Sequence, residues 1–354
     1  TFDSVKTGRR LPQWEPVQFF ADRQPITPAL WTEDRYFHES QKFTGTRGVS
    51  EEVSAAYAMT QGRIGAAGFL AGVRVEETKT ASWGWVRART LSTTAQQTAD
   101  PVSSAARDYA GNYRELGGHY TKWFPSAHAF HDLTPNLKAH LSWSTSFGRA
   151  GLTEFLPAET PSEANRTVTV NNAGLRPQTS SNWDATLEYY FEPVGSVTAG
   201  WFHKSIKDYI LRGQERSIIG AGADNGYNGD YAGYTIIQNQ NVGGATVRGF
   251  EANYQQQLKF LPGLLSGLGV MANYTRVLPE GDFGSVGPRT TNLIPLFVPI
   301  SGNAGVTFRW KKLLTRVQWN YTGRYLNVYS TNAALLAYID ERRTVNASVS
   351  YALT

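Results

Sequence analysis

The segment from Asn171 to Ile210 constrains the fold most, because apolar and polar side chains alternate along it from Trp183 onward. The apolar side holds Trp183, Ala185, Leu187 and Tyr189, and the polar side holds Asp184, Thr186 and Glu188. A period of two residues is that of a β-strand. Turn residues follow at Glu192-Pro193-Val194-Gly195, and a second alternating run begins at Ser196. The sequence therefore predicts a β-hairpin with one apolar and one polar face.

The length of this hairpin suits two environments. A tilted strand needs about 9–11 residues to cross a membrane, and the run from Ser181 to Phe191 is long enough. A soluble β-sandwich also contains strands with one apolar and one polar face. The alternation alone leaves both a transmembrane barrel and a soluble sandwich open.

Similar runs recur along the chain, and the connections between them alternate in length. The predicted strands are residues 52–60, 63–76, 124–132, 137–147, 181–191, 196–210, 245–259, 268–277, 300–310, 313–327 and 342–352. The short connections are residues 61–62, 133–136, 192–195, 260–267 and 311–312, whereas intervening ones such as 78–123 and 213–243 are long and polar. Outer-membrane barrels have short turns on one rim and long loops on the other. The alternation favours an all-β, antiparallel transmembrane barrel.

The polar residues predict which side of each strand looks inward. Lys138 alternates with Leu137 and Ala139, and a cation on the lipid face would cost about 2–4 kcal/mol near the membrane centre. We therefore expect the polar faces to line the lumen. The residues expected to face lipid include Leu187, Ala199 and Val349, and those expected to face the lumen include Asp184, Glu188 and Glu251.

The composition excludes several other classes of protein. No run approaches the ~18 apolar residues of a transmembrane helix. The chain has no cysteine, which excludes thiol chemistry and cysteine-bound metal. A net charge of +5 arises from scattered basic residues, so we expect no nucleic-acid partner. No leader-like segment precedes the strands, and the chain stops at Thr354 where a strand pattern should turn, so we expect a fragment at both ends.

No arrangement of residues predicts catalysis. The closest histidines, His128 and His131, would point to opposite faces of a strand and are poorly placed to share a metal ion. The glycine-rich run at 220–226 lacks the spacing of a nucleotide-binding loop. We therefore predict no catalytic residues, no metal site and no cofactor, in a protein that is not an enzyme.

Two blocks of sequence resemble TonB-dependent outer-membrane receptors. The first reads N-x-G-L-R-P-Q-T-S-x-N-W-D from Asn172, continuing with L-E-Y-Y-F-E-P-V-G and W-F-H-K-S-I-K-D-Y-I. The second contains V-R-G-F-E-A-N-Y-Q-Q-Q-L from Val247, then L-P-G at 261–263 and Tyr274-Thr275. Both are similar to strand pairs in the C-terminal half of the barrel of that family. The resemblance extends over most of the chain and is weakest before Glu51.

The resemblance implies a single partial barrel domain over residues 1–354, with about eleven strands of a roughly 22-stranded barrel. The plug domain and the closing strands would lie outside these residues. It implies active uptake of a scarce, bulky nutrient, such as a ferric siderophore, cobalamin or an oligosaccharide, across the outer membrane of a Gram-negative bacterium. The partners would be outer-membrane lipid, the small-molecule ligand and the TonB energy-coupling complex, which would act through the plug. The alternatives are a secreted carbohydrate-active enzyme or lectin of sandwich or propeller type and, third, a diffusion porin.

Aromatic residues cluster in or beside two of the long connections. Those of the first are Trp83, Trp85, Tyr109, Tyr113 and Trp123, and those of the second are Tyr227, Tyr231 and Tyr234. Aromatic faces near amide side chains suit sugar rings or aromatic chelators, so all of these except Trp123 are candidate ligand contacts. Trp123 is better explained by the aromatic belt of a membrane interface, where Trp and Tyr gather without a ligand.

Overall fold

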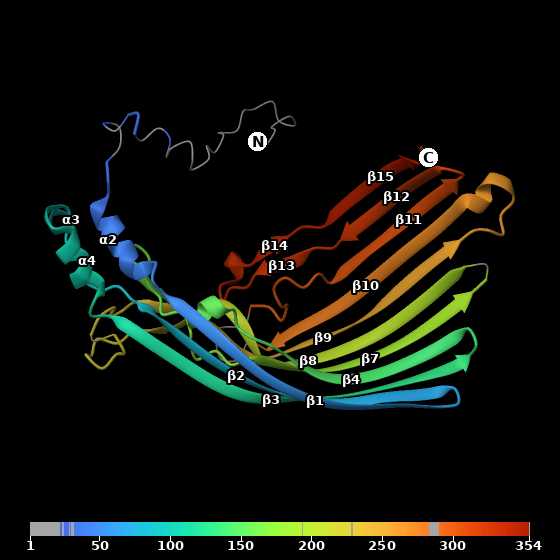
Figure 1. Ribbon diagram of the computed structural model, residues 1–354, viewed down its shortest axis with the longest axis horizontal. Helices are drawn as coiled ribbons and strands as arrows, with labels where there is room; N and C mark the ends of the chain where they lie inside the picture. Colours follow the sequence, from blue (N-terminus) through green and yellow to red (C-terminus); the bar gives the residue numbers. More distant parts are fainter. Residues whose placement is uncertain are drawn as a thin grey trace. The chain divides into compact units, whose positions relative to one another are not determined.

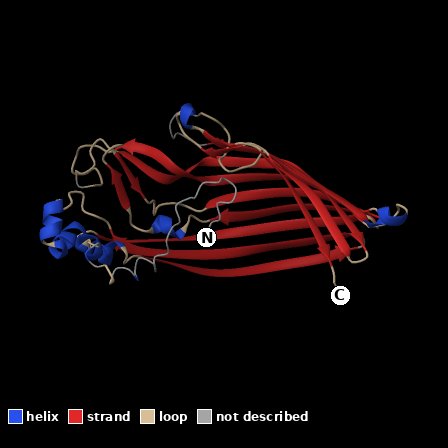
Figure 2. Ribbon diagram, turned by 90° about the horizontal axis from the view of Figure 1, so that it is seen from above, coloured by secondary structure: helices blue, strands red, loops and turns tan. Residues whose placement is uncertain are grey.

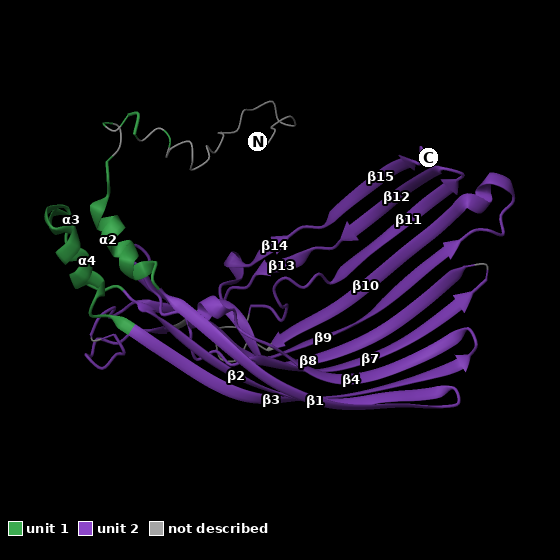
Figure 3. Cartoon of the chain, viewed as in Figure 1, with its two compact units in different colours: residues 1–46, 87–113 green, residues 47–86, 114–354 purple. Residues whose placement is uncertain are grey.

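The computed structural model describes residues 32–192, 194–227, 229–282 and 290–353, together with residues 22, 25–27 and 29. Pro193 of the predicted turn lies outside these residues. The chain divides into two compact units, one of residues 1–46 and 87–113 and one of residues 47–86 and 114–354 (Figure 3). The prediction of one partial barrel domain over the whole chain stays a prediction.

The first unit contains three helices, α2 (Arg35–Thr44), α3 (Thr94–Ala99) and α4 (Pro101–Tyr109). Asp34 caps α2 by accepting a hydrogen bond from the Phe37 amide at 2.8 Å, and Asp100 caps α4 through the Ser103 amide at 3.1 Å. Such caps satisfy amides that have no partner inside the helix. Among the described residues, no helix has both the length and the apolar character needed to cross a membrane.

A buried carboxylate joins the elements of this first unit. Asp108 of α4 has no exposed surface and accepts hydrogen bonds from the Tyr36 hydroxyl at 2.6 Å, the Ser92 amide at 2.9 Å and the Ser92 hydroxyl at 2.7 Å. A buried charge is tolerated only when hydrogen bonds replace its hydration. Asp108 therefore holds α2, the segment before α3, and α4 together.

The second unit is a large, mainly antiparallel sheet (Figures 1 and 2). Its path order is β1-β2-β3-β4-β7-β8-β9-β10-β11-β12-β15, so strands that follow one another along this path lie side by side. The bounds are β1 Gly48–Ile64, β2 Ala67–Trp85, β3 Tyr113–Thr134, β4 Leu137–Gly148, β7 Gln178–Phe191, β8 Gly195–Ile218, β9 Thr235–Gln257, β10 Leu268–Asp282, β11 Ile300–Trp310, β12 Leu313–Thr322 and β15 Arg342–Tyr351. Within the described residues, these eleven strands confirm the all-β, antiparallel prediction.

The long connections contain short strands of their own. β5 (Glu159–Ser162) pairs with β6 (Thr167–Val170), which also pairs in parallel with β9. β13 (Tyr325–Val328) and β14 (Ala337–Ile339) form a separate two-stranded hairpin between β12 and β15. The predicted strand 313–327 was therefore too long, because the main-sheet strand ends at Thr322.

The ends of the strands confirm the predicted alternation of short and long connections, but several connections begin and end at other residues than predicted. The first turn lies at Gly65-Ala66, not at 61–62, because Gly62 pairs with Phe69 and the positive φ of Gly65 (58°) suits glycine. The connection predicted at 78–123 spans only 86–112, and that predicted at 213–243 spans only 219–234. Both flanking strand pairs extend further toward the long-loop end than the alternation suggested.

The register of the strands forms rows across the sheet in which apolar residues lie opposite apolar residues or polar residues opposite polar residues. On the apolar side, Ala139 lies opposite Leu187 and Leu187 lies opposite Ala199. On the other side, one row crosses nine strands, in the order Asp132, Lys138, Glu188, Thr198, Asn253, Asn273, Asn303, Asn320 and Thr344. The segregation of polar from apolar residues is confirmed, whereas the orientation of the apolar face toward lipid stays a prediction.

Apolar clusters on the polar side lie near the long-loop end of the strands. Ile294, in the connection between β10 and β11, is 1% exposed and packs with Ala245, Val247 and Phe202. Phe202 lies opposite Asp184, so this connection covers the same side of the sheet as the predicted lumen residues. The β10–β11 connection thus folds back over the polar face of the sheet.

Candidate functional site

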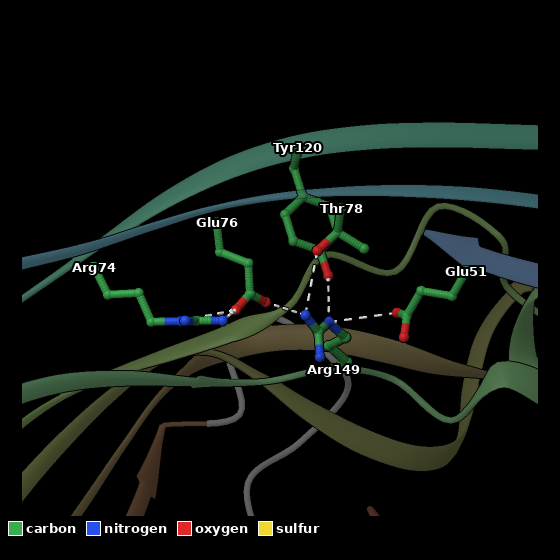
Figure 4. A network of polar contacts seen from close by, with 6 residues as sticks. All are labelled: Glu51, Arg74, Glu76, Thr78, Tyr120 and Arg149. Atoms are coloured by element: carbon green, nitrogen blue, oxygen red, sulfur yellow. Dashed lines mark hydrogen bonds and ion pairs between the residues drawn. The ribbon is translucent and has the colours of Figure 1, made fainter. Parts of the chain in front are cut away.

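A network of charged groups lies on the polar side of the second unit, where β1 and the middle of β2 meet the segment directly after β4 (Figure 4). Arg149, directly after β4, forms ion pairs with Glu76 and, at 3.4 Å, with Glu51. Its guanidinium also donates hydrogen bonds to the Thr78 hydroxyl at 3.3 Å and the Tyr120 hydroxyl at 3.2 Å. One side chain thereby connects β1, β2, β3 and the β4–β7 connection.

The alternation of β2 places the partners of Arg149 together. Arg74, Glu76 and Thr78 are two residues apart and share a face, and Arg74 donates to Glu76 at 2.8 Å. Glu76 is 7% exposed and Thr78 is fully buried. The two arginines and two glutamates of the network have no net charge, which lowers the cost of removing Glu76 from water.

The Arg149 side chain is fixed by packing as well as by charge. Its guanidinium carbon lies 4.7 Å from the centroid of the Phe147 ring, a cation–π contact. Phe147 in turn stacks on Phe124 of β3, with ring centroids 4.7 Å apart. Arg149 is therefore held in one orientation by groups from four segments of the chain.

Arg149 also lines a cavity of about 650 Å³. The walls come from the β4–β7 connection, the ends of β7, β8 and β9, the β10–β11 connection and β13. Its polar lining includes Arg149, Thr153, Glu154, Gln178, Arg212, Asn239 and Asn327, and its less polar lining includes Tyr209, Leu211, Leu296, Val328 and Tyr329. The volume lies in the range of about 300–1,000 Å³ that is usual for small-molecule sites.

A second, smaller cavity of about 380 Å³ lies between the β10–β11 connection and the β13–β14 hairpin. Its lining is mainly apolar and includes Ile294 and Phe297. Arg324 lies at its edge, with its guanidinium carbon 4.5 Å from the centroid of the Tyr338 ring and its Nε 3.4 Å from Asp340. The hairpin and the folded-back connection are joined beside this cavity by a hydrogen bond from the Leu296 amide to the Leu326 carbonyl at 2.7 Å, and the cavity offers few polar groups to a ligand.

Trp83 and Trp85, two of the candidate ligand contacts, lie at the end of β2 and not in a loop. Their rings meet edge to face with centroids 6.3 Å apart, and Trp83 retains 36% of its surface exposed. Trp83 lies opposite Gly48, whose missing side chain leaves room for the indole ring. Ligand contact by this pair stays a prediction. Trp123 lies inside β3 and is 64% exposed.

Tyr109 and Tyr113 belong to the first unit. Tyr109, at the end of α4, stacks on Phe43 of α2 with ring centroids 5.8 Å apart, and burial raises the pKa of its phenol. Tyr113 begins β3 and is 41% exposed. Tyr109 therefore has a packing role between helices, and Tyr113 keeps a face that a ligand could meet.

The third group, Tyr227, Tyr231 and Tyr234, forms a cluster inside the β8–β9 connection. The Tyr231 ring centroid lies 5.5 Å from that of Tyr227 and 5.6 Å from that of Tyr234. Tyr231 is 2% exposed and Tyr234 is 5% exposed, and both pack with Val168 and Ile219. Two of the three rings thus form the core of the loop and present almost no face to a ligand.

The sequence prediction missed the residues that line the larger cavity. Arg149, Gln178, Asn239 and Asn327 lie in or next to long connections without a periodic pattern. The only local signal was the alternation of Arg74, Glu76 and Thr78 on one side of a strand. Within the described residues, no group of three or more metal-ligating side chains is found.

Long antiparallel strands in chain order, with short turns at one end and structured loops at the other, define the wall of an outer-membrane type of β-barrel. Residues 11–354 match the family described as TonB dependent receptor-like, beta-barrel. The chain belongs to this family of TonB-dependent receptor barrels. No curated protein sequence matches it.

Solved structures of transport proteins have the same fold. The copper transporter OprC is 12% identical, with a TM-score of 0.58 over 86% of this chain and 40% of that chain. A mutant of the ferric enterobactin receptor PfeA from Pseudomonas aeruginosa, in complex with enterobactin, is 15% identical, with a TM-score of 0.57 over 87% of this chain and 47% of that chain. The ferric citrate transporter FecA is 14% identical, with a TM-score of 0.57 over 86% and 38%. The chain spans less than half the length of each of these proteins.

Proposed function

We propose that this chain is the barrel part of a receptor that takes up a scarce, bulky nutrient across the outer membrane of a Gram-negative bacterium. The observation that carries the proposal is the family match over residues 11–354, together with a ligand-sized cavity at the long-loop end. Members of the family are receptors and transporters, so the proposal includes no covalent chemistry by this chain.

The arrangement of the chain gives its parts separate roles in uptake. The sheet forms the wall, with its apolar face toward outer-membrane lipid. The connections at the long-loop end form the ligand-binding rim, where the cavity beside Arg149 lies. Energy comes from the TonB complex, acting through a plug domain outside these residues. The ligand is therefore captured by this chain and released by a movement elsewhere in the receptor.

An uptake assay with defined probes tests this proposal. The full-length receptor is expressed in an outer-membrane host with and without TonB, and accumulation of ferric citrate, cyanocobalamin and a maltodextrin mixture is measured. We expect at least one probe to accumulate only when TonB is present and to stop accumulating when a protonophore collapses the proton gradient. Accumulation of all small solutes independent of TonB would indicate a diffusion pore. Release of hydrolysis products into the medium would indicate an enzyme.

A further inference from the structure

We infer that the 650 Å³ cavity binds an uncharged, hydroxyl-rich ligand of the size of a short oligosaccharide. The inference rests on the proposed uptake function and names the class of substrate for that site. It is drawn from the charge balance of the cavity wall and from the hydrogen-bonding groups that remain available there.

The charged groups of the wall are balanced within the protein. Arg149 is paired with Glu76 and Glu51, and Glu76 also binds Arg74. The remaining charged lining residues are one cation and one carboxylate, Arg212 and Glu154, and Arg212 also interacts with other groups of the protein. An anionic ligand would have to compete with carboxylates that already hold the fixed arginine, whereas a neutral ligand would not.

The amide side chains of the wall are oriented as donors. The Gln178 carbonyl oxygen accepts from the Ile210 amide at 3.2 Å, and the Asn239 carbonyl oxygen accepts from the Gly213 amide at 2.8 Å. Gly213 has a φ of 62°, which favours glycine at this position. Backbone groups thus fix the oxygen end of each amide, and the NH2 end is left to donate. Hydroxyl and ring oxygens of a sugar are suitable acceptors.

Other residues of the wall supply apolar contact. Val328 and Leu296 are 49% and 65% exposed, and Tyr209 belongs to the same cavity lining. A sugar ring presents carbon-bound hydrogens on its faces and hydroxyls at its edge, so it needs both kinds of contact. The combination of neutral donors and an apolar wall fits this ligand chemistry better than a highly charged chelate.

Part of the polar face of the sheet is also uncharged. One row crosses the strands, and from β8 to β15 it consists only of neutral amides and hydroxyls, namely Thr198, Asn253, Asn273, Asn303, Asn320 and Thr344. The same row is charged from β3 to β7, at Asp132, Lys138 and Glu188. The neutral part offers donors and acceptors without attracting either sign of charge.

Binding to an array of oligosaccharides tests the inference. Fluorescently labelled full-length receptor is applied to an array of neutral α- and β-linked hexose and pentose oligosaccharides, together with acidic glycans. Ferric citrate binding is measured separately by calorimetry. We expect binding to at least one neutral oligosaccharide and none to ferric citrate or to the acidic counterpart of the bound sugar. Absence of binding to every neutral member, or preference for the anionic probes, would overturn the inference.

Two isosteric variants locate the binding to this cavity. Asn239→Asp and Gln178→Glu each keep the oxygen that accepts a backbone amide and replace the NH2 donor by a carboxylate oxygen. Each should weaken binding of the selected sugar at least tenfold. Asn165→Asp, in an exposed turn outside the cavity lining, is the matched control and should leave affinity unchanged. Unchanged affinity in both cavity variants would place recognition elsewhere and overturn the inference. TonB-dependent uptake of an iron complex in the same receptor would leave the proposed uptake function intact while contradicting the ligand class.

Discussion

Arg149 and Glu76 are 73 residues apart in the chain, yet the guanidinium of one pairs directly with the nearly buried carboxylate of the other. The pairing ties the connection after β4 to the second strand of the sheet. Because Arg149 also lines the larger cavity, the position of a cavity wall depends on a carboxylate outside the cavity lining.

Loss of Arg149 should destabilise the barrel wall. Arg149→Met leaves Glu76 buried with Arg74 as its remaining charged partner. The loss of a hydrogen bond to a charged group costs about 1.5–3 kcal/mol, and we expect a loss of that size. The free energy of unfolding can be measured by urea titration of receptor refolded into lipid vesicles. A second change, Glu76→Gln in the Arg149→Met background, should recover part of the loss. The matched control is Arg248→Met, whose partner Glu280 is 55% exposed, and its effect should stay within about 1 kcal/mol. Equal effects at the two arginines would contradict this account.

Gly249 should tolerate no side chain. A Cβ at this position would overlap the Arg276 carbonyl of the neighbouring strand and the Phe202 ring, and backbone atoms have little freedom to move away. Gly249→Ala should therefore destabilise the folded barrel by about 1–3 kcal/mol. The measurement is the temperature at which the folded band is lost in gel electrophoresis. Gly220→Ala, where a Cβ meets nothing within 4 Å, should leave that temperature unchanged. If the Gly249→Ala barrel lost its folded band at the same temperature as the unchanged protein, the strands around Gly249 would be spaced more widely than in this structure.

The helices of the first unit should lose stability at high pH. Burial and the hydrogen bond to Asp108 raise the pKa of the Tyr36 phenol above its ordinary value of about 10. A raised pKa stabilises the fold fully below the ordinary pKa, and this contribution disappears as the pH rises toward the folded value. Cleavage of residues 86–112 by an alkaline protease should therefore accelerate between about pH 10 and 12. Tyr36→Phe should be cleaved faster already at pH 9, and its cleavage should accelerate less at high pH, because only the raised pKa of Tyr109 then remains. Identical cleavage of the two proteins would contradict the role of this hydrogen bond.

Trp83 and Trp85 provide a test of ligand contact that leaves the loop unchanged. If the ligand taken up in the TonB-dependent assay stacks on them, each change to alanine should cost about 1 kcal/mol of binding, roughly a fivefold loss of affinity. Equilibrium binding to the purified variants measures this effect. Trp310→Ala removes a tryptophan of similar exposure at the short-turn end of β11 and should leave affinity unchanged. Unchanged affinity in the Trp83 and Trp85 variants would assign these rings to sheet packing.

The sequence was sufficient to predict the sheet because its signals are local. Alternation from Trp183 to Tyr189 specifies a strand and its two faces, and the register then joins equivalent faces of neighbouring strands. The ends of the strands were predicted less well. Pairing with β1 helps to extend β2 to Trp85, beyond the residues with the clearest alternation. The helices between residues 94 and 109 were missed because segments of six and nine residues are too short for a periodic signal.

The cavity beside Arg149 was not predicted from the sequence, because it depends on contacts distant in sequence. The aromatic content of the β8–β9 connection suggested ligand binding by Tyr231 and Tyr234, but the loop uses those rings for its own core. Conversely, Arg149 has no local feature that distinguishes it from other loop arginines. Its partners are fixed only when β1, β2 and β4 take their places in the sheet.

Site-specific labelling tests most directly whether the alternating sheet is a membrane barrel wall. The 354 residues contain no cysteine, so single cysteines can be placed at Leu187, Ala199 and Val349 or at Asp184, Glu188 and Glu251 of the full-length receptor, after any cysteine outside this chain is replaced. In intact outer membranes, a membrane-impermeant thiol reagent should modify the second set, which faces the water-filled side, and leave the first set unmodified in lipid. Equal labelling of both sets would contradict the membrane-wall account.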